Sequence, residues 1–351
     1  MSELVRDGIQ EVHIAGESFV LRDLQPSDEA DQKALLALHT EVFGSAADTS
    51  WFGWKYWQGG GQGVGLWLGT RMVAYCGGTP RSVCHQGAWK HDLQIGDVMV
   101  APEWRGVLTR RGPFFHVCDR FYRSRIGAGQ PFDVAWGFPN QRHLHLAVKM
   151  GLSWDAGLMH GLTWTTAGAA LPWHIRSEPW QIEADTSPDN PPDGLFDRTI
   201  QMLWTQMKRS PAAAGVSLGI RDAAYLRWRY LHRPDRNYQW VCVRRAWSTR
   251  PLGVAVVAEA PSDGALLWLD WIGPMQHLPL AALACRTHAR QVGATYLNAW
   301  ASEPVCLALA DSGVNHRSVV AGLGVPVASD VTDNQVAALN WWFMGGDTDF
   351  L

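Results

Sequence analysis

Hydrophobic positions in the first half of the chain switch between a spacing of two and a helical spacing. Alternating stretches predict strands, whereas residues 113–125 carry apolar side chains at helical intervals and predict an amphipathic helix. Ser27 or Asp28 can cap an earlier helix that runs to Phe43. The expected elements are strands at 18–22, 65–69, 72–83, 93–100 and 133–138, and helices at 28–43, at 113–125 and ending near 151.

The second half repeats this order of elements without repeating the residues. It opens on an aromatic run at 225–230, after a proline-rich connection with one helix near 197–208. Strands are expected at 238–245, 252–258, 265–272 and 295–300, near 319 and at 341–344, and helices at 278–292 and 304–312. Repetition of topology alone predicts two related α+β domains from an old duplication. We therefore expect a first domain at 1–165, a connecting segment at 166–215 and a second domain at 216–351.

The composition fits a folded protein with a large core. Of 351 residues, 47% are hydrophobic and 18% are charged, which excludes a disordered chain. The formal net charge of -3 provides no overall basic surface, so we expect neither nucleic acid nor membrane as a partner. Tryptophan is in surplus, with 20 residues, which predicts heavy aromatic burial, ligand-facing platforms or both.

The cysteines and the apolar runs indicate the compartment. None of the 6 cysteines stands in a Cys-x-x-Cys pair, which favours buried free thiols in a reducing environment. Residues 1–21 lack a basic stretch followed by an apolar one, and no apolar run approaches the roughly 20 residues that cross a bilayer. We therefore expect a soluble, cytoplasmic protein.

The segment between the strand at 93–100 and the helix at 113–125 is the most informative about chemistry. It is rich in arginine and glycine, and Pro113 suits the first position of a helix. Free N–H groups of a first helical turn, the helix dipole and arginine side chains together favour an anion. The segment therefore predicts a site for a diphosphate-bearing ligand, with an exposed basic turn as the alternative.

This segment, with Gly137-Phe138-Pro139-Asn140 and Lys149-Met150-Gly151-Leu152 downstream, resembles the GNAT superfamily of N-acetyltransferases. The likeness covers about residues 18–160. The runs 225–230 and 341–350 are similar to bacterial proteins with two such domains, which are often associated with cell-surface polysaccharides. The resemblance implies that each domain has a mixed, mostly antiparallel central sheet flanked by helices.

The resemblance also implies acetyl-CoA as acyl donor, direct attack by an amine on the thioester, and no covalent enzyme intermediate. By that likeness the strand at 93–100 lies beside the donor, and the strand at 133–138 splays away and opens a wedge for the pantetheine arm. The residues implied to bind the donor are Met99, Val100, Arg105, Gly106, Arg110, Arg111, Gly112 and Asn140.

Two positions depart from the family pattern. The usual loop is Arg/Gln-x-x-Gly-x-Gly/Ala, and counting from Arg105 places Leu108 and Arg110 where its small residues stand. We favour a longer loop in which Gly112 approaches the phosphates; the alternative is weak CoA binding. Ala147 replaces a Tyr that often protonates the departing thiolate. Because the ordinary pKa of a thiol is about 8.5, the thiolate can leave without that acid.

Asp97 and His143 are the candidate catalytic bases. Asp97 lies on the strand beside the proposed thioester, on the same face as Met99, and can accept a proton from an ammonium group directly or through water. The alternative for Asp97 is a structural carboxylate. His143 is the minor candidate, and because it shares no helix face with His145 we expect no metal site.

Four aromatic residues before the first sheet, Trp51, Trp54, Tyr56 and Trp57, are candidates to line the acceptor cleft, with burial in the core as the alternative for each. In the second half, residues 273–277 contain one glycine and no arginine. We therefore expect the second domain to bind no CoA and to form a wall of the acceptor cleft.

Together these features predict an acyltransferase, monomeric or homodimeric, that acts on a small-molecule amine such as an amino sugar. Two rival classes remain. One is an aminoacyl transferase of the peptidoglycan-bridge type, and the other is an inactive acyl-CoA-binding sensor or scaffold, which Leu108 and Ala147 motivate.

Overall fold

A computed structural model of the chain describes residues 5–6, 8–44, 47–106, 111–182, 194–260, 264–348 and 350–351. These residues belong to two compact units whose ranges interleave along the chain. The first unit contains 1–82, 90–156 and 323–336, and the second contains 83–89, 157–322 and 337–351.

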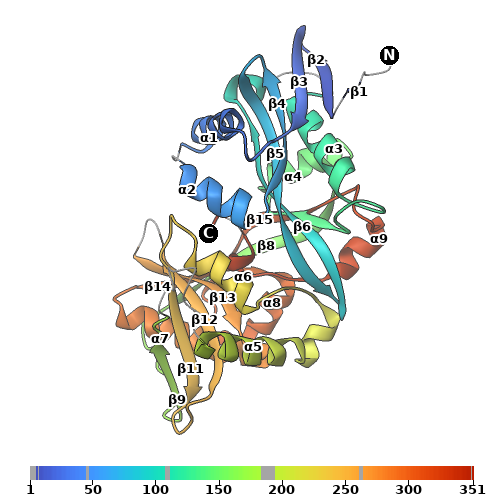
Figure 1. Cartoon of the computed structure of the whole chain (residues 1–351). Coiled ribbons are helices and arrows are strands. Elements are labelled where there is room, and N and C mark those ends of the chain that lie inside the picture. The colour runs from blue at the N-terminus through green and yellow to red at the C-terminus, as the bar shows by residue number, and fades with distance from the viewer. Residues whose placement is uncertain are drawn as a thin grey trace. The chain divides into compact units, whose positions relative to one another are not determined.

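The first unit is a twisted sheet with helices on both faces. Its strands, in spatial order, are β1 (Val5–Arg6), β2 (Ile9–Ile14), β3 (Glu17–Asp23), β4 (Gln62–Leu68), β5 (Arg71–His85), β6 (Ala88–Val100), β7 (Ala135–Gly137) and the end of β15 (His316–Pro326). Strands β1 to β5 pair antiparallel, whereas β6 and β7 are parallel. Figure 1 shows α1 (Glu29–Phe43) and α2 (Thr49–Phe52) on one face and α3 (Pro113–Arg125) and α4 (Gln141–Lys149) on the other. The small α9 (Asp333–Val336) completes this unit.

The second unit repeats this plan. Its sheet has the order β8 (Ser153–Thr165), β14 (Tyr296–Ser302), β13 (Ala265–Ile272), β12 (Pro251–Glu259), β11 (Gln239–Arg245) and β9 (Ile175–Pro179). Strand β10 (Ser217–Gly219) pairs with β16 (Trp341–Trp342) and with the end of β5. The helices are α5 (Gly194–Lys208), α6 (Ala223–Leu226), α7 (Leu278–Gln291) and α8 (Glu303–Ala308). Strands β13 and β14 are parallel and α7 connects them, as α3 connects β6 and β7.

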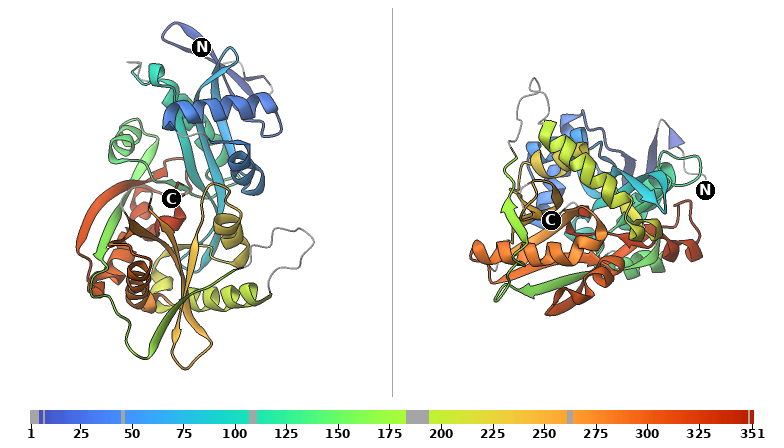
Figure 2. Two further views of the ribbon diagram at one scale, coloured as in Figure 1. Left: turned by 90° about the vertical axis from the view of Figure 1, so that its left-hand side faces the viewer. Right: turned by 90° about the horizontal axis from the view of Figure 1, so that it is seen from below.

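Along each central strand of the second unit, successive side chains point alternately into two hydrophobic cores on opposite faces of the sheet. In β12, Ala255 and Val257 pack into the core that contains the buried face of α7. Val254 and Val256 pack into the core that contains Phe196, Ile200 and Leu203 of α5. The two helices accordingly lie on opposite faces of the sheet, as the view from below shows (Figure 2). A strand buried on both sides reads as a continuous apolar run, and β13 is buried at every position.

Two strands pair outside the unit that holds most of their own half of the chain. β8, which ends the first half, pairs antiparallel with β14, and β15, near the end of the chain, pairs antiparallel with β7 at Gly324 and Gly137. The compact units are therefore not the continuous ranges 1–165 and 216–351, and the expected connection 166–215 contributes β9 and α5 to the second unit.

The structure confirms the predicted α+β class with mixed, mostly antiparallel sheets. Asp28 caps α1 by accepting a hydrogen bond from the N–H of Ala30 at 2.7 Å, and α3 spans the predicted residues. Strands β1, β2, β8, β9 and β10 were not predicted. Among the described residues, no helix combines the length and apolar sequence needed to span a bilayer.

We predict that Gly63→Ala destabilises the protein by about 1–3 kcal/mol, because overpacking a filled core displaces its side chains. A Cβ at Gly63 would lie 1.9 Å from Oη of the buried Tyr75. Gly53→Ala is the matched control, because a Cβ there meets nothing within 4 Å and φ is not positive. Urea unfolding should show a lower midpoint for Gly63→Ala alone; equal midpoints for the two variants would contradict the packing around Tyr75.

Candidate functional site

The N-terminus of α3 is a helix start without a side-chain cap. Gly112 is the N-cap residue, with φ of -82°, and Pro113 occupies the first helical position. Since glycine offers no side-chain acceptor, the first N–H groups of α3 remain available to a ligand. The predicted helix start is confirmed. Arg110 and Leu108 lie outside the described residues, so the length of the loop stays a prediction.

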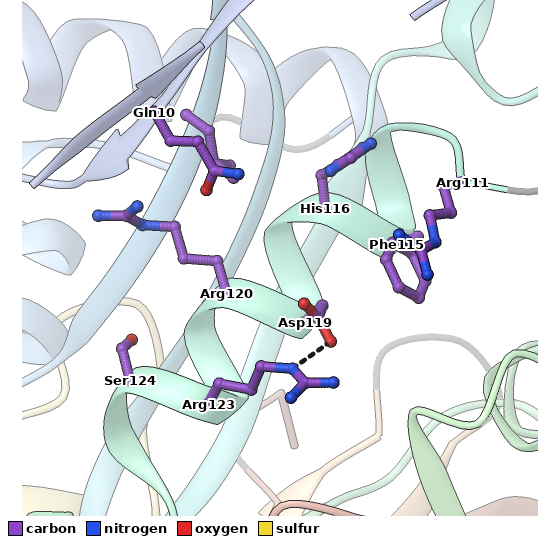
Figure 3. Close-up of a pocket in the computed structure, with 9 residues that line it drawn as sticks. Gln10, Arg111, Phe115, His116, Asp119, Arg120, Arg123 and Ser124 are labelled. Carbon is purple, nitrogen blue, oxygen red and sulfur yellow. Dashed lines mark hydrogen bonds and ion pairs between the residues drawn. The ribbon is translucent and has the colours of Figure 1, made fainter. Parts of the chain in front are cut away.

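The described arginines of this loop are exposed but differently engaged. Nε of Arg105 donates to the carbonyl of Val100 at 2.9 Å, which places its charge at the end of β6. Gly106, the next residue, is exposed. The guanidinium of Arg111 lies 5.1 Å from the ring centroid of Phe115. Both residues line an open pocket of about 380 Å³ between α3 and the strands β2 and β3, where Gln10 and Leu21 also line it. Figure 3 shows Gln10 across from the side chains of α3.

The parallel pairing of β6 and β7 stops where β7 ends. The last paired residues are Ile95 and Gly137, and β6 continues alone through Gly96 to Val100. Beyond Ile95, β6 therefore runs without β7 as a partner toward the residues that lead into the α3 loop, and the wedge that the resemblance implies stays a prediction. Within this stretch Met99 is buried and Val100 is half-buried.

Asp97 interrupts β6 with a left-handed backbone conformation, with φ of 54°. Such a conformation costs about 1–2 kcal/mol for a residue other than glycine, and it persists only where the surroundings hold it. It also breaks the strict alternation of side chains along the strand, so the expected shared face of Asp97 and Met99 does not follow from strand geometry.

A buried cation and a phenol hold this aspartate. Nζ of Lys55 lies 2.6 Å from Oδ2 of Asp97, and Oη of Tyr56 donates to the same oxygen at 2.9 Å. The side chains of Lys55 and Asp97 are 3% and 10% exposed. Burial, together with the charge of Asp97, raises the pKa of Tyr56 well above its ordinary value, so its hydroxyl remains a donor. Both residues come from the π-helical turn Gly53–Gln58 that follows α2.

Solved structures share this arrangement of elements, although no family model and no curated protein matches the chain. A probable N-acyltransferase from Enterococcus faecalis V583 is 12% identical with a TM-score of 0.61, covering 89% of this chain and 73% of that one. A GCN5-related N-acetyltransferase from Anabaena variabilis ATCC 29413 is 15% identical with a TM-score of 0.60, covering 88% and 73%. Saccharomyces cerevisiae N-myristoyltransferase with bound myristoyl-CoA is 9% identical with a TM-score of 0.51, covering 90% and 83%.

The chain has the GNAT fold. The strand β6, the helix α3 and the strand β7 are the elements in which the resemblance placed the donor, and the first unit presents them in that order.

The aromatic residues next to the GNAT sheet divide by burial. Trp54 and Tyr56 are 1% and 3% exposed, and Trp51, at 9%, lies with its ring centroid 5.3 Å from Nζ of Lys55. Trp57 is 63% exposed, and its indole N–H donates to the carbonyl of Pro26 at 3.3 Å. Of the four, Trp57 alone presents a largely exposed ring to a ligand, and contact with an acceptor stays a prediction for all of them.

Asn140 and His143 lie together at the start of α4. Oδ1 of Asn140 caps the helix by accepting from the N–H of His143 at 2.9 Å. Nδ2 of Asn140 lies 3.3 Å from Nδ1 of His143, so the imidazole can accept there. Partial burial and the charges of Arg142 and Arg105 lower the pKa of His143 below its ordinary value. The capping bond therefore engages Oδ1 of Asn140, and contact of Asn140 with the donor stays a prediction.

The second unit contains a counterpart of the aspartate cluster. On β13, Oδ2 of Asp270 accepts from Oη of Tyr230 at 3.1 Å, and Oδ1 lies 2.8 Å from Nε of Arg221. A second carboxylate, Asp347, lies 2.6 Å from Nη2 of Arg221. Arg229 donates to backbone carbonyls of the segment 346–351. The turn Gly345–Asp347 contacts β13, the strand that corresponds to β6.

Neither Lys55 nor the second cluster was predicted from the sequence. A repeated pattern could have indicated both: an Asp, then any five residues, then Trp, a basic residue and Tyr. This pattern occurs at 48–56 and again at 222–230. Asp48 and Asp222 cap the two short helices, and Lys55 and Arg229 take the cationic position.

We predict that Lys55→Met and Asp97→Asn each destabilise the protein by about 3–5 kcal/mol, because each leaves a buried charge without its partner. The double variant should lose less than the sum of the two, since it removes both charges. Urea unfolding of the four proteins measures this coupling. Strictly additive losses would show that Lys55 and Asp97 do not interact.

Proposed function

We propose that the first unit binds an acyl-CoA, with acetyl-CoA as the donor, and transfers the acyl group to a small-molecule amine. One observation carries the proposal: β6 continues past its last pairing with β7 toward the uncapped N-terminus of α3. The wedge suits a pantetheine arm, and the free N–H groups of α3 suit a pyrophosphate. The structural similarity to N-acyltransferases supports this proposal.

The two units differ in the loop that precedes the helix of the proposed donor site. Where the first unit has an arginine-containing loop before α3, the second has Gly273 to His277 before α7, with no arginine. Arg229 of the second unit is buried and holds backbone carbonyls of the chain's own last residues. We therefore assign the donor site to the first unit alone.

His143 is better suited than Asp97 to act as the base. Oδ2 of Asp97 already accepts from Lys55 and Tyr56, and protonating the carboxylate would leave the buried ammonium of Lys55 without its counter-charge. His143 is exposed, and its lowered pKa keeps it uncharged at neutral pH. The charge of Arg105, which is anchored at the end of β6, is close enough to contribute to that shift.

In the proposed reaction the amine nitrogen attacks the thioester carbon, the C–N bond forms and the C–S bond breaks. The proton of the amine passes to Nδ1 of His143, which gives up its contact with Nδ2 of Asn140. CoA leaves as a thiolate that takes a proton from water, and the imidazolium returns its proton to the solvent. The side chain at position 147 is an alanine, so no phenol from that position protonates the thiolate. An amino sugar is the acceptor that the resemblance suggests.

We predict that acetyl-CoA binds the full chain in calorimetry with a dissociation constant below millimolar. Arg110→Ala combined with Arg111→Ala should weaken binding at least about tenfold, since a hydrogen bond to a charged group contributes roughly 1.5–3 kcal/mol. Arg290→Ala, an exposed arginine on α7, is the matched control and should leave the affinity unchanged.

Equal affinity of the double variant and the wild type would remove the pyrophosphate assignment, and no binding below millimolar would contradict the donor. Binding without release of CoA on a panel of amines would favour a sensor. If turnover is found, His143→Gln should lower kcat and leave acetyl-CoA affinity intact. Because the pKa of His143 lies below its ordinary value, turnover should persist at pH 6.5 and fall only as the solution becomes more acidic.

A further inference from the structure

Two exposed tryptophans from distant segments meet at one end of the second unit. Trp173 precedes β9 and Trp247 lies in the turn between β11 and β12, and they are 79% and 64% exposed. Their ring centroids are 6.0 Å apart, and the ring of His174 lies 5.5 Å from Trp173 and 6.3 Å from Trp247. We call these three residues the aromatic tip. The β11–β12 turn lies at the lower end of this unit in Figure 1.

Backbone pairing fixes the aromatic tip in place. The N–H of Ala246 donates to the carbonyl of His174 at 2.8 Å, and Arg245 pairs with Ile175 across β11 and β9. The two rings are therefore held side by side by sheet geometry. Exposed aromatic surface that is held rigidly and left in water marks an interaction site more often than scattered apolar residues do.

Positive charge surrounds the tip. Arg176 lies on β9, Arg244 and Arg245 end β11, and Arg250 lies in the turn before β12. Glu178 of β9 is the carboxylate that accompanies them. Glu178 is held by Arg244, with contacts of 2.7 and 3.0 Å. In the part of the chain that the structure describes, no acidic side chain lies within ion-pair distance of Arg245 or Arg250.

Arg176 keeps its charge at the tip by donating to the carbonyls of Trp173 and Ile175, at 2.8 and 3.0 Å. The net charge of the whole chain is -3, so this basic patch is a local feature.

We propose that the aromatic tip docks the protein on an anionic membrane surface. Indole rings prefer the headgroup region, where the ring is out of water and the N–H stays hydrogen-bonded. Arginines near an anionic surface each add about 1 kcal/mol of attraction. The sequence led us to expect no membrane partner, because only the overall charge was considered. A single-stranded nucleic acid, which also combines stacking with negative charge, is the competing occupant.

The experiment is co-sedimentation of the full chain with vesicles of equal parts phosphatidylcholine and phosphatidylglycerol, compared with vesicles of phosphatidylcholine alone. We expect binding to the anionic vesicles that weakens in high salt. Trp173→Ala with Trp247→Ala should reduce the partition coefficient at least about tenfold. Arg245→Glu with Arg250→Glu should reduce it by a similar factor, since two attractions of about 1 kcal/mol are lost.

Trp89→Ala is the matched control. Trp89 is 48% exposed, stands beside Trp204 and lies with its ring centroid 5.5 Å from Nζ of Lys208, yet it belongs to a different surface. It should bind vesicles as the wild type does. No binding to anionic vesicles would overturn the proposal, as would equal binding by the tip variants. Tighter binding to a single-stranded RNA oligonucleotide than to vesicles, lost in the same variants, would also overturn it. Acetyl-CoA affinity, measured in parallel, is independent of all these outcomes.

Discussion

The buried ion pair between Lys55 and Asp97 is the constraint on which the candidate site depends. It joins the π-helical turn after α2 to the middle of β6, and Tyr56 adds a second contact to the same oxygen. A left-handed aspartate inside a strand is unfavourable by itself, and a buried lysine is unfavourable without a counter-charge. Each therefore requires the other. The part of β6 that continues past its last pairing with β7 therefore carries the aspartate that Lys55 and Tyr56 hold.

The aspartate–phenol contact occurs once in each unit, but the two copies differ. Asp270 and Tyr230 repeat the aspartate–phenol contact on β13, but the cations have different partners. Arg229 holds carbonyls of the chain's own end, and Arg221 is shared by two carboxylates. The helices α3 and α7 both begin without a side-chain cap, but the loop before α3 contains arginines, whereas residues 273–277 before α7 contain none.

Much of the fold could be predicted from the sequence, because periodicity and helix caps are local signals. The helices at 28–43 and 113–125 and the strands 265–272 and 93–100 were placed to within a few residues. The pairing of β8 with β14 and of β15 with β7 could not be predicted. The hydrophobic pattern of a strand shows which face is buried but does not show which strand lies beside it. Lys55 was missed for a related reason: its counter-charge is 42 positions away along the chain, at Asp97. The repeated Asp–Trp–cation–Tyr spacing would have pointed to it.

Hydrogen–deuterium exchange of the full chain with and without acetyl-CoA tests the central claim most directly, because it reports both units at once. We predict that saturating acetyl-CoA slows exchange at the end of β6, residues 96–100, and in the first turn of α3, residues 113–116. Exchange at the corresponding end of β13 and start of α7 should not change. Protection in the second unit instead of the first, or none at a concentration that calorimetry shows to be saturating, would contradict the account.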